Sequence, residues 1–464
     1  MKKIKNVFYI HTHDTGRIIN PYGYNVSSNN LKDFFRDSLT FQNAFSVAPT
    51  CSPSRAGLLT GSFPHQVGML GLAQRGFVLD YSKHMAQFLK SQGFVTVLSG
   101  VQHECEYYTD HSKAYKNLGY IYDLTSDSGK YSEEDLLIWD KENSEILCDW
   151  LRDYSDEKPL FVSFGLHGTH RKYPSFIDKE FVVNESVPPD NIVNNPSNRE
   201  DFAKYKTSLK MTDETIGGVL NILREKGYFE NSLIFITTDH GIAYPFSKCS
   251  LKDSGVGVML AIHTPSNKNK GKTFDGLISQ IDIFPTICDL LEIEKPEYLQ
   301  GKSFVDLLEK NRDIEHIVIN ENIYSENNFH TSYEPCRSIR SERYKYIRYF
   351  DKSYKRINFS NIDNSPAKEF LLENGLLELQ KDEEQFYDLY YDKYENNNLI
   401  NSDNYQPQID VFRQKLYEKM RETDDPLLEG ELKILDNWKV NKKECIEAGS
   451  KNPDDYISLG RKKE

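Results

Sequence analysis

Short apolar runs alternate with amphipathic stretches over residues 1–310 of the chain. Such runs are typical of strands buried on both faces, and amphipathic stretches with a period near 3.6 are typical of helices. The pattern predicts strands at 6–10, 94–100, 160–164, 233–237 and 257–262, and helices at 31–36, 84–92 and 200–226. Because buried strands alternate with helices, we expect an α/β fold with a doubly wound, mostly parallel sheet.

Polar residues gather where these strands end. Asp14 follows the first strand, His103 follows the strand at 94–100, and Asp239 follows the strand at 233–237. Open parallel sheets place their sites at the carboxyl ends of the strands. We therefore expect distant segments of the chain to converge on one cleft.

Beyond about residue 310 the pattern changes. Residues 317–320 and 343–348 alternate in the manner of antiparallel strands, and 410–422 indicates a helix. We divide the chain into a catalytic domain at 1–310 and a smaller α+β subdomain at 311–464, with an antiparallel sheet and a terminal helix. The absence of a linker or repeat indicates that the second unit packs on the first.

Composition narrows the class of protein. The 464 residues carry a net charge of -13, which argues against nonspecific binding to nucleic acid or to an anionic membrane. A local cationic pocket could still bind an anionic substrate. The seven cysteines are scattered without a Cys-x-x-Cys pair, so neither a disulfide framework nor a zinc ribbon is indicated. The apolar stretch after Met1–Lys5 is too short for a signal peptide, and no run approaches a membrane span, so we expect a reduced, cytoplasmic protein.

The segment Cys51-Ser52-Pro53-Ser54-Arg55, followed by Leu58-Leu59-Thr60-Gly61, carries the main chemical signal. It resembles the signature of the type I sulfatases, although a lone cysteine before a helix can also be structural. The resemblance implies an alkaline-phosphatase-like fold and a maturase partner that oxidises Cys51 to formylglycine. One hydroxyl of the aldehyde hydrate attacks sulfur, and the other expels sulfate by collapse to the aldehyde.

The resemblance also implies one divalent metal, held by Asp14, Asp239, His240 and the modified Cys51. Oxygen ligands suit calcium, and the metal would polarise the sulfate and activate the attacking hydroxyl. Any one Asp at a strand end can instead cap a loop. His13 stands where most of the family has a second Asp, and whether it binds the metal stays open. Imidazole ligands would also admit manganese or zinc.

Further residues match the catalytic positions of the family. Arg55 lies one helical turn beyond Cys51 and can stabilise the charge of the nucleophile. His103 resembles the base that assists sulfate release, with a solvated loop histidine as the alternative. The family usually has a lysine two residues before this histidine, and here Val101 occupies that position.

Two more residues match sulfate-binding positions. His170 resembles the sulfate-binding histidine and could protonate the leaving group, with His167 as the alternative occupant. Lys248 matches the cationic sulfate clamp, with an exposed surface lysine as the alternative. In the C-terminal segment, His330 and Arg337 could bind hydroxyls or a carboxylate of a sugar, or could belong to a hairpin that only packs on the main sheet.

Matches along the whole chain extend the resemblance and favour the heparan N-sulfatase branch. They include His65–Met69, Ser279–Thr286, Gln385–Leu389 and Glu422–Pro426. We expect hydrolysis of a sulfate ester or sulfamate of a small sulfated carbohydrate, and we favour an N-sulfoglucosamine-like sugar as the substrate. Two alternatives stay open. His240 is also consistent with a phosphonate monoester or phosphodiester hydrolase. Val101 and His13 are consistent with an inactive homologue that only binds sulfated glycans. A homodimer is also left open.

Overall fold

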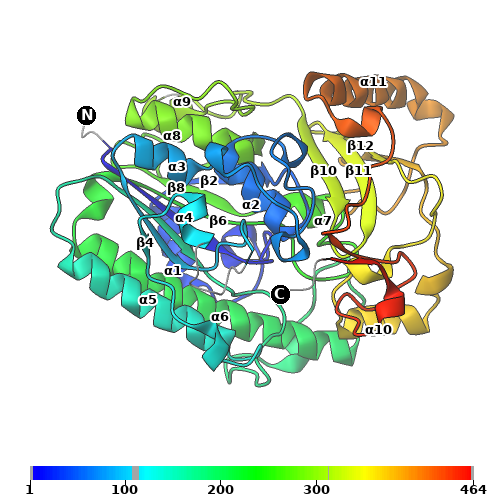
Figure 1. Ribbon diagram of the computed structural model, residues 1–464, viewed down its shortest axis with the longest axis horizontal. Coiled ribbons are helices and arrows are strands. Elements are labelled where there is room, and N and C mark those ends of the chain that lie inside the picture. The colour runs from blue at the N-terminus through cyan, green and yellow to red at the C-terminus, as the bar shows by residue number, and fades with distance from the viewer. Residues whose placement is uncertain (1–3, 107–113, 312, 461–464) are drawn as a thin grey trace.

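The computed structural model describes residues 4–106, 114–311 and 313–460. In the described residues, nine strands form one sheet with the order β4-β3-β5-β1-β6-β8-β2-β7, and β9 pairs with β2 (Figure 1). The strands are β1 (Asn6–Thr12), β2 (Leu39–Phe45), β3 (Val95–Gly100), β4 (Tyr122–Asp123), β5 (Leu160–Gly165), β6 (Ser232–Thr238), β7 (Gly257–Val258), β8 (Leu260–His263) and β9 (Thr273–Ser279). Residues 1–3, part of the basic N-terminal segment considered above, lie outside the described residues.

The sheet is mixed and mostly parallel. The ladder from β4 through β3, β5 and β1 to β6 is parallel, as is the β2–β9 pair. The strand predicted at 257–262 is instead two short strands, β7 and β8, which pair antiparallel with their neighbours. The other four predicted strands are confirmed, whereas β2 and β9 have mixed polar patterns and were not predicted.

Helices cover both faces of this sheet, as a doubly wound fold requires (Figure 1). One face carries α1 (Asn29–Arg36), α5 (Leu136–Asp153) and α6 (Pro196–Glu225), and the other carries α2 (Cys51–Thr60), α3 (Met85–Ser91), α8 (Ile283–Leu291) and α9 (Val305–Glu309). Two short helices are α4 (Ala114–Leu118) and α7 (Asp253–Val256). The predicted helices at 31–36, 84–92 and 200–226 correspond to α1, α3 and α6.

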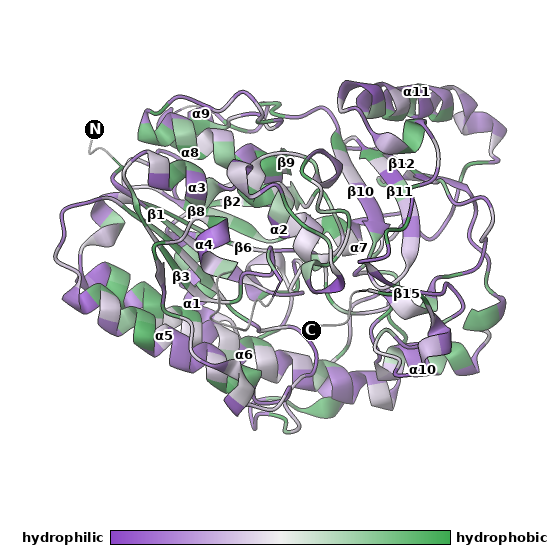
Figure 2. Cartoon of the chain, viewed as in Figure 1, coloured by the Kyte–Doolittle hydropathy of each residue, from purple (hydrophilic) through white to green (hydrophobic). Residues whose placement is uncertain are grey.

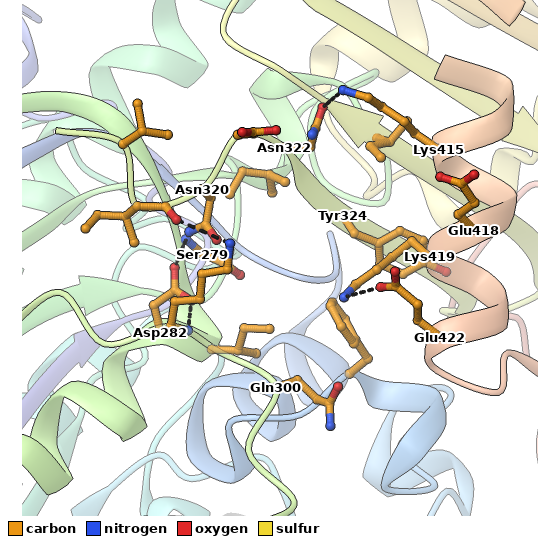
Figure 3. Close-up of a pocket in the computed structure, with 18 residues that line it drawn as sticks. Ser279, Asp282, Gln300, Asn320, Asn322, Tyr324, Lys415, Glu418, Lys419 and Glu422 are labelled. Carbon is orange, nitrogen blue, oxygen red and sulfur yellow. Dashed lines mark hydrogen bonds and ion pairs between the residues drawn. The ribbon is translucent and has the colours of Figure 1, made fainter. Parts of the chain in front are cut away.

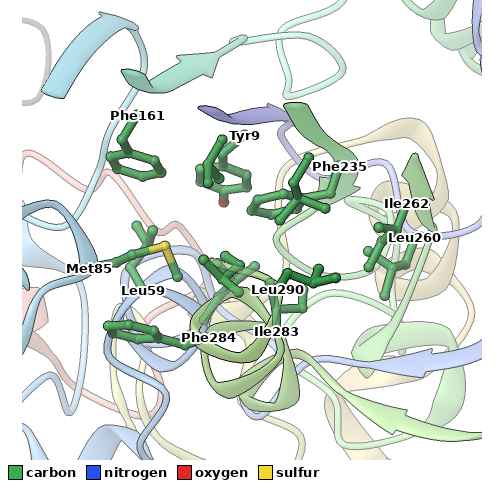
Figure 4. Close-up of a cluster of buried hydrophobic side chains, with 14 of the residues drawn as sticks. Tyr9, Leu59, Met85, Phe161, Phe235, Leu260, Ile262, Ile283, Phe284 and Leu290 are labelled. Atoms are coloured by element: carbon green, nitrogen blue, oxygen red, sulfur yellow. The ribbon is translucent and has the colours of Figure 1, made fainter. Parts of the chain in front are cut away.

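Strand β1 lies at the centre and alternates between the two cores. Val7 and Tyr9 belong to the core beneath α2, α3 and α8, and Phe8 and Ile10 belong to the core beneath α1, α5 and α6. Figure 4 shows Tyr9 within the first of these cores. The strands of the large sheet are coloured mainly as hydrophobic in Figure 2, in keeping with burial on both sides. This burial fixes the register of the polar residues at the strand ends.

The C-terminal unit is built on a four-stranded antiparallel sheet, β10-β11-β12-β13. Its elements are β10 (Ile323–Phe329), β11 (Tyr333–Arg340), β12 (Tyr344–Tyr349), α10 (Pro366–Glu373), β13 (Glu384–Asp388), α11 (Gln406–Glu422), β14 (Lys439–Asn441) and β15 (Tyr456–Leu459). The predicted strand at 343–348 is β12, and the predicted helix at 410–422 is α11.

The strand predicted at 317–320 is wrong. Val318 is exposed, and only Asn320 forms an isolated bridge, with Leu277. The alternation there reflects a surface connection that crosses between the two units. These units share apolar packing, since Phe77 stacks on Trp438 with ring centroids 4.3 Å apart. The domain boundary at 310 stays a prediction.

None of the helices in the described residues combines the length and the apolar character needed to cross a membrane.

Candidate active site

Cys51 is the first residue of α2, a helix in which all ten residues are buried. Pro53 sits in the first turn, where a missing N–H costs no helical hydrogen bond. The helix ends at Gly61, whose φ of 63° is left-handed and whose N–H bonds to the Gly57 carbonyl. The Cys51 side chain therefore stands at the positive end of a rigid helix dipole.

Asp14 lies just beyond β1 in a left-handed conformation with φ of 56°. This conformation is costly for a residue with a Cβ, so the surroundings must hold it. The Asp14 N–H donates to Asp239 Oδ1 at 2.9 Å, and the His13 N–H donates to the Gly168 carbonyl at 2.9 Å. Because β1 is hydrogen-bonded to both β5 and β6, the loops after these three strands meet at one edge of the sheet.

Four buried donor groups converge there. The ligand atoms of His13, Asp14, Cys51 and Asp239 all lie within 4.8 Å of one another. His13 Nε2 is 3.1 Å from Cys51 Sγ and 3.3 Å from Asp239 Oδ2. His13 therefore lies among the donors, where the sequence had left its part in metal binding open.

His240 approaches the same atoms with its own imidazole. Its Nε2 is 3.3 Å from Cys51 Sγ, 3.3 Å from Asp14 Oδ1 and 3.6 Å from Asp239 Oδ2. The ring centroids of His13 and His240 are 6.5 Å apart, so the two imidazoles approach Asp14, Cys51 and Asp239 from different sides. We call these five residues the strand-end cluster: His13, Asp14, Cys51, Asp239 and His240.

The strand-end cluster fits a divalent cation. Within the described residues, Asp14 Oδ1 and His13 Nδ1 are buried and have no hydrogen-bond partner. Buried polar atoms without a partner are rare in folded proteins and mark a bound ion or a functional group. Two carboxylates and two imidazoles supply the oxygen and nitrogen ligands that such a cation needs.

Arg55 stabilises the cluster through Asp239. Its Nη2 donates to Asp239 Oδ2 at 3.1 Å, and its Nη1 contacts His11 Nδ1. Burial would raise the pKa of Asp239, but His240 and Arg55 outweigh burial and hold that pKa below its usual range. His11 faces this pair from within β1, and no feature of the apolar run around it signalled a role.

Lys248 is buried rather than an exposed surface lysine. Its Nζ lies 2.7 Å from Asp14 Oδ2, 3.3 Å from His170 Nε2 and 3.1 Å from Asp363 Oδ2. Burial alone would lower the pKa of Lys248, but Asp14 and Asp363 outweigh it and place that pKa well above its usual value. The ammonium is thus a fixed positive charge beside the cluster.

Comparison with known proteins assigns the chain that carries these residues to a family. A family model described as Sulfatase matches residues 5–293. The chain belongs to the sulfatase family. It is therefore a sulfuric ester hydrolase, as the signature at Cys51 had implied. A second family model, described as N-sulphoglucosamine sulphohydrolase, C-terminal, matches residues 240–371.

Individual relatives agree with this assignment. The human N-sulphoglucosamine sulphohydrolase is 28% identical over 323 residues, which cover 61% of this chain and 62% of that protein. An ulvan-active sulfatase from Formosa agariphila is 25% identical over 470 residues, covering 89% of this chain and 74% of the relative.

Solved structures confirm the expected alkaline-phosphatase-like α/β fold. A 2-O GAG sulfatase superposes with a TM-score of 0.71 at 19% identity, covering 93% of this chain and 95% of the other. The phosphonate monoester hydrolase of Agrobacterium radiobacter superposes with a TM-score of 0.68 at 17% identity, covering 90% and 96%.

In this sulfatase, burial controls the ionisation of the groups around the cluster. Burial raises the pKa of the Cys51 thiol well above its usual value, so the unmodified side chain is a poor nucleophile. Burial and Arg55 lower the pKa of His103, which favours a neutral imidazole. His103 is buried and is therefore not a solvated loop histidine. Its Nε2 is 2.8 Å from Gln74 Oε1.

The loop after β5 brings both histidines to the cluster, His170 more closely: the ring centroid of His13 is 4.4 Å from that of His170 and 6.3 Å, edge-on, from that of His167. His170 Nε2 is 3.6 Å from Asp14 Oδ2, and the side chain keeps 27% of its surface exposed. The backbone N–H of His167 instead donates to Asp140 Oδ1 at 2.7 Å, and the next N–H binds the other oxygen of that carboxylate. Asp140 thereby fixes the loop that carries His170.

The C-terminal unit reaches the site through two connected loops. Asn361 Oδ1 accepts hydrogen bonds from the Thr331 and Ser332 N–H groups, both at 3.0 Å, and so joins the β10–β11 turn to the loop before α10. His330 stands in the first loop and Asp363 in the second. Burial lowers the pKa of His330, and the positive charge of Lys248 lowers it further. His330 is therefore close enough to Lys248 to feel its charge. We call His330 and Asp363 the C-terminal rim.

Arg337 is not part of this rim. Its guanidinium is fully buried, donates to both carboxylate oxygens of Asp425 and to the Asn327 carbonyl, and so serves the interior of the C-terminal unit. Asp363, in contrast, was not among the site residues predicted from the sequence. It lies in a polar loop far from any motif, and no local pattern could have paired it with Lys248.

A separate cavity of about 490 Å³ lies along the seam between the two units (Figure 3). Its lining includes Asp282, Asn320, Lys415 and Lys419, and it contains none of the site residues predicted from the sequence. The cluster at Cys51 is therefore distinct from this seam cavity.

Proposed function

We propose that this sulfatase removes a sulfate group from a small sulfated carbohydrate, with an N-sulfoglucosamine-like sugar as the favoured substrate. The convergence of the strand-end cluster with Arg55, His170 and Lys248 carries the proposal. The match of residues 240–371 to the N-sulphoglucosamine sulphohydrolase model and the similarity to the human enzyme support the choice of sugar.

The nucleophile in this proposal is formylglycine, formed from Cys51 by a maturase. One hydroxyl of its hydrate forms the new O–S bond while the bond from sulfur to the sugar breaks. The second hydroxyl loses its proton and the aldehyde re-forms, which breaks the O–S bond and releases sulfate. A thiol held neutral by burial performs neither step.

The strand-end cluster would hold one divalent cation, and calcium is favoured by its two carboxylates. Such an ion supplies charge stabilisation at the sulfate oxygens when bound. The imidazoles of His13 and His240 leave manganese and zinc as further candidates.

The remaining residues bind the sulfate and move protons. Lys248 supplies a permanent positive charge for a sulfate oxygen, next to His170. His170 can donate a proton to the leaving oxygen or nitrogen of the sugar, since it is both near Lys248 and partly exposed. His103 can accept the proton of the second hydroxyl, because burial keeps its imidazole neutral. His330 would contact the sugar itself.

The direct experiment compares matured protein with a Cys51→Ala variant on N-sulfoglucosamine and on sugars that carry O-linked sulfate. We expect release of inorganic sulfate by the matured protein and none above background by the variant, with the same circular dichroism. Full activity in Cys51→Ala would overturn the mechanism, and activity confined to O-sulfated sugars would overturn the choice of an N-linked group.

A phosphonate monoester hydrolase is the second candidate, supported by the fold similarity to that enzyme and by the Asp239-His240 pair. Rates on a sulfate and a phosphonate ester of one aryl alcohol separate the two functions. The sulfatase proposal predicts the higher kcat/KM for the sulfate.

A further inference from the structure

The donors of the strand-end cluster have a different chemistry before residue 51 is oxidised. In the chain as encoded, Cys51 presents sulfur beside the His13 imidazole and two carboxylates. His13 Nε2 lies 3.1 Å from Cys51 Sγ, 3.3 Å from Asp239 Oδ2 and 3.7 Å from Asp14 Oδ1. A tetrahedral zinc ion with bonds of about 2.0–2.3 Å separates its ligands by about 3.3–3.6 Å. The spacing of these donors already approaches that of a zinc site.

A further observation favours zinc over an alkaline-earth ion in this state. His103 contributes to an overlapping donor group with His13 and Cys51, in which all ligand atoms also lie within 4.8 Å. Sulfur and imidazole donors select zinc, whereas calcium and magnesium prefer oxygen alone. Within the described part of the chain, Asp14 Oδ1 is buried without a hydrogen-bond partner, with the His240 and His13 imidazoles at 3.3 and 3.7 Å, and points to a cation in either state.

We propose that the unmatured chain, with Cys51 still a thiol, binds Zn²⁺ through Cys51, His13 and Asp239, with Asp14 completing the set. Binding transfers the Cys51 thiol proton to solvent as the sulfur–zinc bond forms, and no oxidant or reductant takes part. In protein whose Cys51 has been converted to formylglycine by the maturase, which supplies the oxidant and removes the sulfur, oxygen stands in the place of sulfur and the same cluster is an oxygen-rich site. Maturation therefore changes the metal preference of the site as well as its nucleophile.

Zinc binding to the folded thiol form also stabilises that form, because a ligand that binds only the native state adds to its free energy of unfolding. The proposal depends on the donor geometry of the unmodified chain and not on which substrate the matured enzyme hydrolyses.

Cobalt provides the test. Protein made without a maturase, with the Cys51 thiol verified by mass spectrometry, is titrated with Co²⁺ and then with Zn²⁺. We expect a thiolate-to-cobalt charge-transfer band in the near ultraviolet that saturates at one equivalent and disappears as zinc displaces cobalt. The matched variants are Cys51→Ser, which removes the sulfur donor, and Cys148→Ser, which removes a buried thiol on α5.

Cys51→Ser should lose the band and bind zinc about 100-fold or more weakly, since even the outer partners of metal ligands contribute 10–100-fold. Cys148→Ser should match the parent protein, and His13→Asp should also weaken zinc binding. A band that persists in Cys51→Ser, or a correctly folded thiol form that shows none, overturns the proposal. Neither outcome bears on sulfate release by matured protein, so the two proposals fail separately.

Discussion

The strand-end cluster and the C-terminal rim are built in different ways. Four of the five cluster residues follow β1 or β6, and Cys51 opens a fully buried helix, so regular backbone sets their positions. His330 and Asp363 stand on two irregular loops that are joined through the Asn361 side chain. The difference indicates that the proposed reacting centre is rigid, whereas the surface proposed to meet the sugar depends on contacts between loops.

Loss of an Asp239 carboxylate oxygen should have the largest effect. Asp239→Asn removes a charge that faces Arg55, His13 and His240, and we expect kcat/KM to fall by about 10⁵-fold, as for groups that act as one catalytic unit. Sulfate release and bound metal are measured together. A variant that retains more than a tenth of parental activity would show that the cluster is not the reacting centre.

His170→Ala should have the next largest effect, and its size should depend on the leaving group. Loss of a proton donor typically costs about 10²–10⁴-fold. We expect that loss on a sulfated sugar and a much smaller one on the sulfate of an acidic phenol, which departs without a proton. Equal losses on both substrates would assign His170 to sulfate binding alone.

Asp363→Asn tests the rim. The carboxylate is one-fifth exposed beside Lys248, His170 and His330, so its charge both orients Lys248 and faces an incoming sugar. We expect kcat/KM on a monosulfated sugar to fall about tenfold, in line with the 1–3 kcal/mol of a charge-assisted hydrogen bond. The control is Asp382→Asn, an acidic residue of the C-terminal unit that contacts Asn398 instead. An unchanged kcat/KM in Asp363→Asn would remove the rim from the substrate site.

Arg337→Ala should separate stability from activity most sharply. Breaking one side of a buried ion pair costs about 3–5 kcal/mol of unfolding free energy, since Asp425 would be left buried without its partner. We expect a lower denaturation midpoint with kcat and KM of the folded protein unchanged. A raised KM at full stability would return Arg337 to the substrate site.

The sequence predicted that the cluster residues converge, because they stand at strand ends and in a short signature. Burial on both faces made β1, β3, β5 and β6 visible as apolar runs, and each strand is followed within five residues by a residue of the candidate site. The division of 257–262 into two antiparallel strands depends on pairing with β2 and β6, which no local pattern contains.

The C-terminal rim was predicted poorly because its contacts, like the pairing of β7 and β8, join residues far apart in the sequence. Arg337 and Asp363 are polar residues in the same unit, yet one pairs with Asp425 in the interior and the other with Lys248 at the site. Their partners are separated from them by 88 and 115 positions in the sequence (425 − 337 and 363 − 248). Only the tertiary contacts decide which of the two lies beside the strand-end cluster.

The central claim is that residue 51, as formylglycine within the strand-end cluster, performs the hydrolysis. Mass spectrometry of the peptide that contains Cys51, on active protein from its native host, tests it most directly. We expect the mass loss of thiol-to-aldehyde conversion in a fraction of molecules that rises in proportion to specific activity. Fully active protein with an unmodified Cys51 thiol would contradict it.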